Sequence, residues 1–407
     1  MDTEVYVHVE LDEQNFLVGK LWARSRGNRE SATFEYDDKW LSNPLRFSLE
    51  PSLKVGPGPF HTLNDRTLFG SFGDSAPDRW GRTLMRRAER LEATAEKRAV
   101  RSLREIDYLL GVNDFARQGA LRFSLKENGS YLSTDGKKKI PPLINLSKLL
   151  SASKKVLSDK ESSEDLKLLL APGSSLGGAR PKASILDKDG QLAIAKFPHT
   201  ADEINTVIWE AVALTLAEQA GISVPVWRLE EIENNSVLLL RRFDRDGLRR
   251  IPFLSAMSML NARDNEQRSY LELADILRVY GSSVKTDLHE LWRRIVFSTM
   301  ISNTDDHLRN HGFLLYGNGG WRISPVYDIN PVPLDIKPRI LSTCIDLDDG
   351  TASLELALSV HKYFDLSETE AKEIINKVKS SVKNWRKVAS DFGIKKTEIE
   401  RMKSAFL

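Results

Sequence analysis

The stretch Ser302-Asn303-Thr304-Asp305-Asp306-His307-Leu308-Arg309-Asn310 collects carboxylate and amide oxygens directly after an apolar run. That run has helical spacing and is predicted to form a helix, with apolar positions at Leu288, Leu291, Trp292, Ile295, Val296 and Met300. A further acidic residue, Asp328, follows a predicted hairpin with strands at 313–316 and 321–323. Because Mg²⁺ prefers a few hard oxygen ligands together with phosphate oxygens, Asn310 and Asp328 are candidate magnesium ligands.

Asp305 precedes Asn310 by the interval that separates the catalytic aspartate from the metal-binding asparagine in protein-kinase catalytic loops. In this interpretation Asp305 accepts the proton of a substrate hydroxyl. Three alternatives remain open. Asp305, Asp306 and His307 could form a capping turn with a satisfied histidine, and the acidic cluster could serve metal-dependent hydrolysis. A zinc site is the third, although His307 and His311 have no further nitrogen or sulfur ligand nearby in sequence.

Two earlier segments add candidates for binding phosphate groups. Segment 173–182 contains Gly177 and Gly178, and glycines let backbone N–H groups approach phosphate oxygens. It matches a P-loop poorly, because no lysine-serine pair follows, and a plain turn between strands is the alternative. Lys196 lies in the apolar strand 192–197, so its ammonium needs a polar partner. Nucleotide phosphates or the carboxylate of Glu210 would serve, and a lysine that snorkels from a strand end is the simpler alternative.

The order of these features along the chain favours a kinase. A glycine segment, a strand lysine, a helix glutamate, a short apolar strand at 237–240, the Asp305–Asn310 pair and Asp328 follow one another as in protein kinases. Each feature alone is a weak signal, whereas the ordered set is a specific one.

The rest of the chain indicates two lobes behind an N-terminal subdomain. Val5, Val7 and Val9 alternate with other residues as in a half-buried strand, and Ser75-Ala76-Pro77 is typical of a capped helix start. Residues 126–170, rich in serine and lysine, are interpreted as a boundary or flexible excursion. We predict an α+β, bilobal protein-kinase-like fold. Its parts are an N-terminal α/β subdomain (1–125), a smaller β-rich nucleotide-binding lobe (126–245) and a larger helical lobe with the catalytic loop (246–407).

The helix predicted after Pro77 has one apolar and one basic face. The basic face carries Arg79, Arg82, Arg86, Arg87 and Arg90. Such a run is usually a solvated face, and a docking surface for an acidic partner is the alternative.

The composition limits the classes of protein. The 407 residues carry 59 Lys+Arg and 57 Asp+Glu, a net charge of +2, which argues against a protein that coats nucleic acid through bulk charge. The single Cys344 excludes an internal disulfide framework. No apolar run approaches the ~20 residues that cross a bilayer. The acidic start Met1-Asp2-Thr3-Glu4 does not match a signal peptide, so we expect a cytoplasmic protein without a membrane partner.

Motifs along most of the chain resemble those of HipA-family serine/threonine kinases, the toxins of bacterial type II toxin–antitoxin modules. These motifs are Ser75-Ala76-Pro77-Asp78-Arg79-Trp80-Gly81-Arg82, Tyr108-Leu109-Leu110-Gly111-Val112, Arg117-Gln118-Gly119-Ala120-Leu121-Arg122-Phe123, Ser175-Leu176-Gly177-Gly178-Ala179-Arg180-Pro181-Lys182, Arg242-Phe243-Asp244-Arg245, Thr304-Asp305-Asp306-His307-Leu308-Arg309-Asn310 and Tyr327-Asp328-Ile329. The last two together are specific.

The resemblance implies a role for each matching residue. Asp305 would be the catalytic base, with Asn310 and Asp328 as magnesium ligands. Residues that would contact or surround ATP are Gly177, Gly178, Ala179, Arg180, Lys182, Lys196, Glu210, Arg241, Phe243, His307, Asn310, Tyr327 and Asp328. Ser175, or its neighbour Ser174, would be the autophosphorylated serine whose modification expels the loop and silences the enzyme.

The resemblance thus implies an ATP- and Mg²⁺-dependent serine/threonine protein kinase. Its substrate would be a translation protein such as an aminoacyl-tRNA synthetase, and a small HipB-like helix-turn-helix antitoxin would bind and restrain it. The chain would bind operator DNA mainly through the antitoxin, in keeping with its small net charge. Two alternatives remain open: a non-catalytic pseudokinase that acts as corepressor, and a small-molecule kinase of the aminoglycoside-phosphotransferase type.

Overall fold

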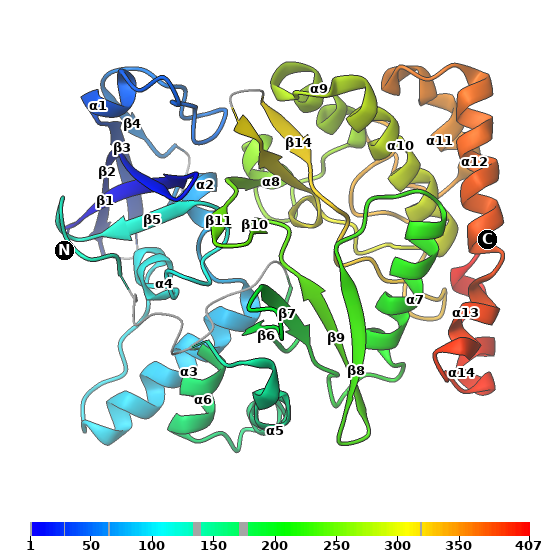
Figure 1. The fold of residues 1–407 in the computed structure, drawn as a ribbon, viewed down its shortest axis with the longest axis horizontal. Helices are drawn as coiled ribbons and strands as arrows, with labels where there is room; N and C mark the ends of the chain where they lie inside the picture. Colours follow the sequence, from blue (N-terminus) through cyan, green and yellow to red (C-terminus); the bar gives the residue numbers. More distant parts are fainter. Residues whose placement is uncertain (1, 28, 64–65, 133–139, 171–177, 318–319) are drawn as a thin grey trace. The chain divides into compact units, whose positions relative to one another are not determined.

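The computed structural model describes residues 2–27, 29–63, 66–132, 140–170, 178–317 and 320–407 (Figure 1). The chain divides into two compact units. The first comprises Met1–Ala201 and Glu230–Leu254, and the second comprises Asp202–Leu229 and Ser255–Leu407. The chain passes from one unit to the other after Ala201, within strand β8 (Trp227–Ile232) and within strand β12 (Phe253–Ser255). The three-part division at 125 and 245 stays a prediction.

The first unit begins with an antiparallel sheet in the order β4-β3-β2-β1-β5 (Figure 1). Its strands are β1 (Asp2–Leu11), β2 (Gln14–Arg26), β3 (Arg29–Tyr36), β4 (Pro59–His61) and β5 (Leu121–Ser124). The strand predicted from Val5, Val7 and Val9 is confirmed as β1, and these three side chains are fully buried. They pack in one core with Phe34 and Phe72, so the period-two pattern marks the buried face of the sheet.

The described part of the first unit also contains several helices. They are α1 (Asp38–Leu41), α2 (Gly70–Asp74), α3 (Arg79–Ala95), α4 (Glu105–Gly111), α5 (Leu146–Leu157) and α6 (Ser163–Leu170), with a 3-10 turn η2 (Leu143–Asn145) before α5. The helix start predicted at Ser75 is wrong. Ser75 follows α2 as its C-cap, and Asp78 is the N-cap of α3, because its carboxylate accepts a hydrogen bond from Gly81 N at 2.8 Å.

The interpretation of 126–170 as a flexible excursion is wrong for its second half, which forms α5 and α6. Leu149, Leu150, Leu166 and Leu169 are buried in one core with residues of the second sheet of this unit. Serine and lysine occupy much of the remaining surface of α5, and α6 adds Glu164, Asp165 and Lys167. The average composition therefore concealed an amphipathic pattern.

The second sheet of this unit carries the predicted lysine strand. β6 (Lys182–Leu186) and β7 (Leu192–Lys196) pair antiparallel around a turn at 187–190, and β7 pairs antiparallel with β9 (Asn235–Arg241). The strands predicted at 192–197 and 237–240 are confirmed. A small ribbon of β10 (Arg245–Asp246) and β11 (Arg249–Arg250) follows β9.

The second unit is mainly helical. Its elements are α7 (Thr206–Gln219), α8 (Ala256–Met259), α9 (Tyr270–Tyr280), α10 (Val284–Ile301), η3 (Leu308–Asn310), β13 (Gly312–Leu315), β14 (Trp321–Ile323), α11 (Leu354–Ser359), η5 (His361–Phe364), α12 (Glu368–Val382), α13 (Trp385–Asp391), α14 (Lys396–Arg401) and η6 (Met402–Ala405). Helix α10 packs against α9, α11 and α12 (Figure 1). This buries α10 on most sides and fixes its C-terminal end, from which the predicted catalytic loop leaves.

Candidate active site

The loop begins where α10 ends at Ser302, whose backbone is left-handed (φ 49°) and whose side chain is buried. A left-handed residue stops a helix and redirects the chain. The loop then runs through 303–307 into η3 and returns along β13.

Asp306 anchors this loop from inside the unit. Its carboxylate accepts a hydrogen bond from the hydroxyl of Tyr270 and lies 2.6 Å from His311 Nε2, and its carbonyl accepts one from Thr343 Oγ1 at 2.7 Å. Burial, with the nearby Asp306 charge, raises the pKa of Tyr270 well above its ordinary value. The histidine that contacts the buried carboxylate of this loop is therefore His311, and not His307. Asp306 is 2% exposed, and its hydrogen bonds hold the loop in place.

Asp305 faces the opposite way, since 66% of its side chain is exposed. Its Oδ1 lies 3.4 Å from Lys337 Nζ, and its backbone carbonyl accepts a hydrogen bond from Asn310 Nδ2 at 3.0 Å. This bond uses the amide nitrogen of Asn310. The amide oxygen, Asn310 Oδ1, is buried and has no hydrogen-bond partner in the described part of the chain. A buried oxygen without a partner is costly unless something else binds it.

Hydrogen bonds on both sides of Asp328 hold its segment against the same loop. Tyr327 donates its hydroxyl to the carbonyl of Arg309 at 2.7 Å, and the amide of Asn330 donates to Asn303 Oδ1 at 3.1 Å. Asp328 itself has a left-handed backbone (φ 58°), which is uncommon outside glycine and clusters at functional sites. The structure therefore brings together the segments that carry Asp305, Asn310 and Asp328.

The donors in this assembly fit magnesium. Asn310 Oδ1 and the Asp328 carboxylate are hard oxygen ligands, the kind that Mg²⁺ takes from proteins before phosphate oxygens complete its shell. His307 is half-buried at the start of η3, and no described residue pairs with its Nδ1. Among the described residues no three His, Cys, Asp or Glu side chains gather as a metal site.

In the first unit, Gly177, Ser174 and Ser175 lie outside the described residues. Gly178 has a positive φ of 85°, and its carbonyl accepts a long hydrogen bond from Trp80 N at 3.4 Å. Ala179 and Arg180 are exposed. Their contacts with ATP phosphates stay predictions.

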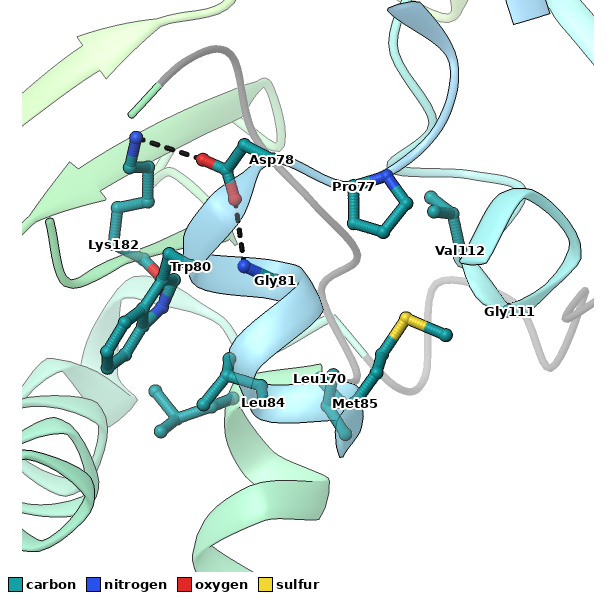
Figure 2. A pocket seen from close by; sticks show the side chains of 11 residues that line it. Pro77, Asp78, Trp80, Gly81, Leu84, Met85, Gly111, Val112, Leu170 and Lys182 are labelled. Carbon is teal, nitrogen blue, oxygen red and sulfur yellow. Dashed lines mark hydrogen bonds and ion pairs between the residues drawn. The ribbon is translucent and has the colours of Figure 1, made fainter. Parts of the chain in front are cut away.

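Lys182 lies beside a pocket at the N-terminal end of α3, where Figure 2 shows its ammonium directed at Asp78. Lys182 Nζ lies 3.0 Å from Asp78 Oδ2, and the other carboxylate oxygen caps α3. Trp80 Nε1 donates to the Lys182 carbonyl at 3.0 Å. The Asp78–Trp80 motif therefore attaches α3 to β6. Lys182 already has an internal carboxylate partner, and its contact with ATP stays a prediction.

The remaining predicted ATP contacts are distributed over both units. Lys196 ends β7 and pairs through its backbone with β6 and β9, while Glu210 is buried on α7 in the second unit. Arg241 is exposed and forms an ion pair with Asp189. The Phe243 ring lies 6.4 Å from that of Phe253. The roles of these four residues in binding ATP stay predictions.

A buried ionic cluster occupies the Arg242–Arg245 motif, and we call it the latch: Arg242, Asp244 and Arg245 with the carbonyls and amide of 116–119. Asp244 is fully buried and accepts hydrogen bonds from Arg242 Nε (2.8 Å), Arg245 Nη1 (2.9 Å) and Gly119 N (2.8 Å). The two guanidinium groups donate further to the carbonyls of Ala116 and Arg117. Sequence reasoning recognised this motif but missed its structural role.

Sequence reasoning also missed Lys337, Tyr270 and the support given by Asp306. The contacts of Lys337 with Asp305 and of Tyr270 with Asp306 join residues 32 and 36 positions apart, so no local spacing indicates them. The adjacent acids Asp305 and Asp306 were the only signal available. One is exposed and the other is buried, and the sequence does not say which.

Comparisons with known proteins agree with this architecture. The structure resembles that of the Shewanella oneidensis MR-1 toxin–antitoxin system HipA, HipB and its operator DNA, with a TM-score of 0.65 and 13% identity over 98% of this chain and 94% of that chain. At this identity the likeness shows the fold alone. It confirms the predicted α+β, kinase-like bilobal class.

Family models identify the family. The HipA-like C-terminal domain matches residues 174–386, more than half of the chain, and the HipA N-terminal domain matches residues 8–106. The chain therefore belongs to the HipA family, as its motifs indicated.

Two curated relatives match over shorter stretches. They are "Putative kinase" of Haemophilus influenzae, 23% identical over 214 residues, and "Putative kinase Y4dM" of Sinorhizobium fredii, 27% identical over 135 residues. The matches cover 45% and 30% of this chain, and they span only 61% and 32% of the two relatives. Within the described residues, no helix has the length and apolar character that would let it span a membrane.

Proposed function

We propose that this chain is an ATP- and Mg²⁺-dependent serine/threonine protein kinase and the toxin of a type II toxin–antitoxin module. Membership of the HipA family and the names of the curated relatives support this proposal. The observation that carries it is the buried Asn310 Oδ1, which no described residue satisfies, in a loop that also presents the exposed Asp305.

The chain's own residues would divide the work of phosphoryl transfer. The exposed Asp305 carboxylate would orient a serine hydroxyl and accept its proton. Asn310 and Asp328 would hold magnesium, which when bound neutralises charge on the phosphate oxygens. Lys196, steadied by Glu210, would contact the phosphates, while the backbone of Gly177, Gly178 and Ala179 would approach them.

The proposed partners follow from the family. The Shewanella structure is a complex of HipA with HipB and operator DNA, so we propose a HipB-like helix-turn-helix antitoxin here, with DNA met mainly through it. The proposed substrate is a translation protein such as an aminoacyl-tRNA synthetase, in the cytoplasm. Autophosphorylation is proposed at Ser175 or Ser174, both outside the described residues.

Phosphate transfer from labelled ATP tests the proposal. The wild-type chain is expected to label itself and proteins of a bacterial lysate in the presence of Mg²⁺. Asp305→Asn should lower the rate by about 10²–10⁴-fold, the usual contribution of a general base, without lowering the melting temperature. Asp348→Asn, which changes another exposed acid of the same unit, is the matched control and should leave the rate unchanged.

Other outcomes identify the alternatives. A wild-type chain that binds its antitoxin yet transfers no label would be a corepressor without kinase activity. Label found only in small molecules would indicate a small-molecule kinase. A phosphopeptide map of the labelled chain would separate Ser174 from Ser175.

A further inference from the structure

The arginines of α3 fall into two groups, and the first group binds acidic segments of the same chain. Arg82 forms a bidentate pair with Glu105 of α4, at 2.5 and 2.7 Å. Arg87 lies 2.7 Å from both Asp159 and Glu161, in the connection between α5 and α6. Helix α3 therefore holds carboxylates of its own chain on two flanks.

The second group consists of Arg79, Arg86 and Arg90, which are exposed. They share one face, because steps of seven and eleven residues return to nearly the same angle on a helix of about 3.6 residues per turn. No ion pair joins any of them to another described residue, and the side-chain hydrogen bond from Arg86 to Thr83 Oγ1 stays within the face. With a rise of about 1.5 Å per residue, the Cα atoms of the three arginines span roughly 16 Å along the helix. We call this surface the arginine face.

The arginine face contains no exposed carboxylate of its own. Glu92 and Glu96, the exposed acids of this helix end, are rotated from it by about 100° or more. The helix is rigidly mounted, since Trp80 and Leu84 on its other side are buried. The backbone positions that carry the three positive charges therefore have a fixed spacing.

We propose that the arginine face docks a carboxylate-bearing segment of a protein partner, either an acidic helix or an acidic extended peptide. The guanidinium fork matches the geometry of a carboxylate, and α3 already uses neighbouring arginines in this way within its own fold. Arg82 and Arg87 of the same helix bind carboxylates, and this favours an acidic protein segment over a nucleic acid as the occupant. This surface is independent of the proposed phosphoryl transfer.

Binding of the full chain to fluorescent poly-L-glutamate tests the proposal. We expect the triple variant Arg79→Gln, Arg86→Gln, Arg90→Gln to bind about tenfold more weakly, since each exposed ion pair contributes roughly two- to threefold. The matched control removes three exposed arginines of β2 and β3 in Arg24→Gln, Arg26→Gln, Arg29→Gln, which have no ion pair with described residues. It should bind nearly as well as wild type.

Further arms decide between the outcomes. Equal weakening in both triple variants would overturn the proposal, because the effect would then be one of charge alone. It would also fail if a random-sequence DNA duplex bound through the arginine face while poly-L-glutamate did not. An unchanged melting temperature confirms the fold, and the single variant Arg86→Gln, expected to weaken binding about twofold, replaces the triple variant if that one is unstable.

Discussion

The latch of the first unit and the predicted catalytic loop of the second are both built on buried charge, but they differ in which polar atoms they leave without a partner. In the latch, Asp244 receives hydrogen bonds from two guanidinium groups and one backbone amide. In the loop, Asp306 is similarly enclosed, yet Asn310 Oδ1 and His307 Nδ1 are buried without a partner among the described residues. A closed assembly of this kind supports the fold, whereas an open one is prepared for a ligand.

The largest effect should come from breaking the latch. Asp244→Asn removes the carboxylate from two buried guanidinium groups and should lower the free energy of unfolding by about 3–5 kcal/mol. Urea denaturation measures this change. Asp189→Asn, which removes the exposed partner of Arg241, is the control and should cost no more than about 1 kcal/mol. Similar decreases in the free energy of unfolding for both variants would contradict the conclusion that the latch supports the fold.

The latch should lose its contribution to stability at low pH, and the buried contact between Tyr270 and Asp306 should lose its contribution at high pH. Burial alone raises the pKa of Asp244, but Arg242 and Arg245 outweigh it and hold that pKa well below the ordinary 3.8. The latch therefore contributes stability above pH 3.8 that is lost progressively as the pH falls below that value.

Tyr270 behaves in the reverse sense. Its raised pKa means that the hydroxyl stays protonated in the folded chain above pH 10.0, where the unfolded chain ionises. Its contribution is present below pH 10.0 and is lost as the pH rises further. Melting temperatures should thus be less acid-sensitive in Asp244→Asn and less alkali-sensitive in Tyr270→Phe than in wild type. A variant as pH-sensitive as wild type at its own end would refute the assignment.

The smallest effect is expected for the exposed ion pair between Lys337 and Asp305. Lys337→Met should lower the rate of phosphate transfer by no more than about fivefold, because an exposed ion pair contributes ~1 kcal/mol or less. The unfolding free energy should not change. Lys337→Arg keeps the positive charge and should recover most of the rate. A loss as large as that of Asp305→Asn would show that Lys337 does more than orient the carboxylate.

Local signals predicted the parts of the fold that depend on neighbouring residues. The alternation at Val5, Val7 and Val9 marks β1, and the hairpin predicted at 313–316 and 321–323 is present as β13 and β14. Serine and aspartate both suit the N-cap position, so the sequence could not choose between Ser75 and Asp78. The hydrogen bond that Asp78 accepts from Gly81 N identifies Asp78 as the cap.

Contacts between distant residues could not be predicted in the same way. The interval from Asp305 to Asn310 and the later Asp328 indicated a common site, and the hydrogen bonds of Tyr327 and Asn330 bring those segments together. Nothing in the local sequence connects Lys337 with Asp305, since the chain between them passes through a hairpin.

The latch has a consequence for anyone who wishes to cut this chain into pieces. Its arginines and aspartate lie within the stretch matched by the C-terminal family model, but the carbonyls and amide that satisfy them belong to residues 116–119, which precede that stretch. A fragment starting at residue 174 would lose the carbonyls and the amide that complete the hydrogen bonding of these three buried charged groups. Family boundaries are therefore poor guides for truncation here, and purified fragments should be expected to aggregate or melt early.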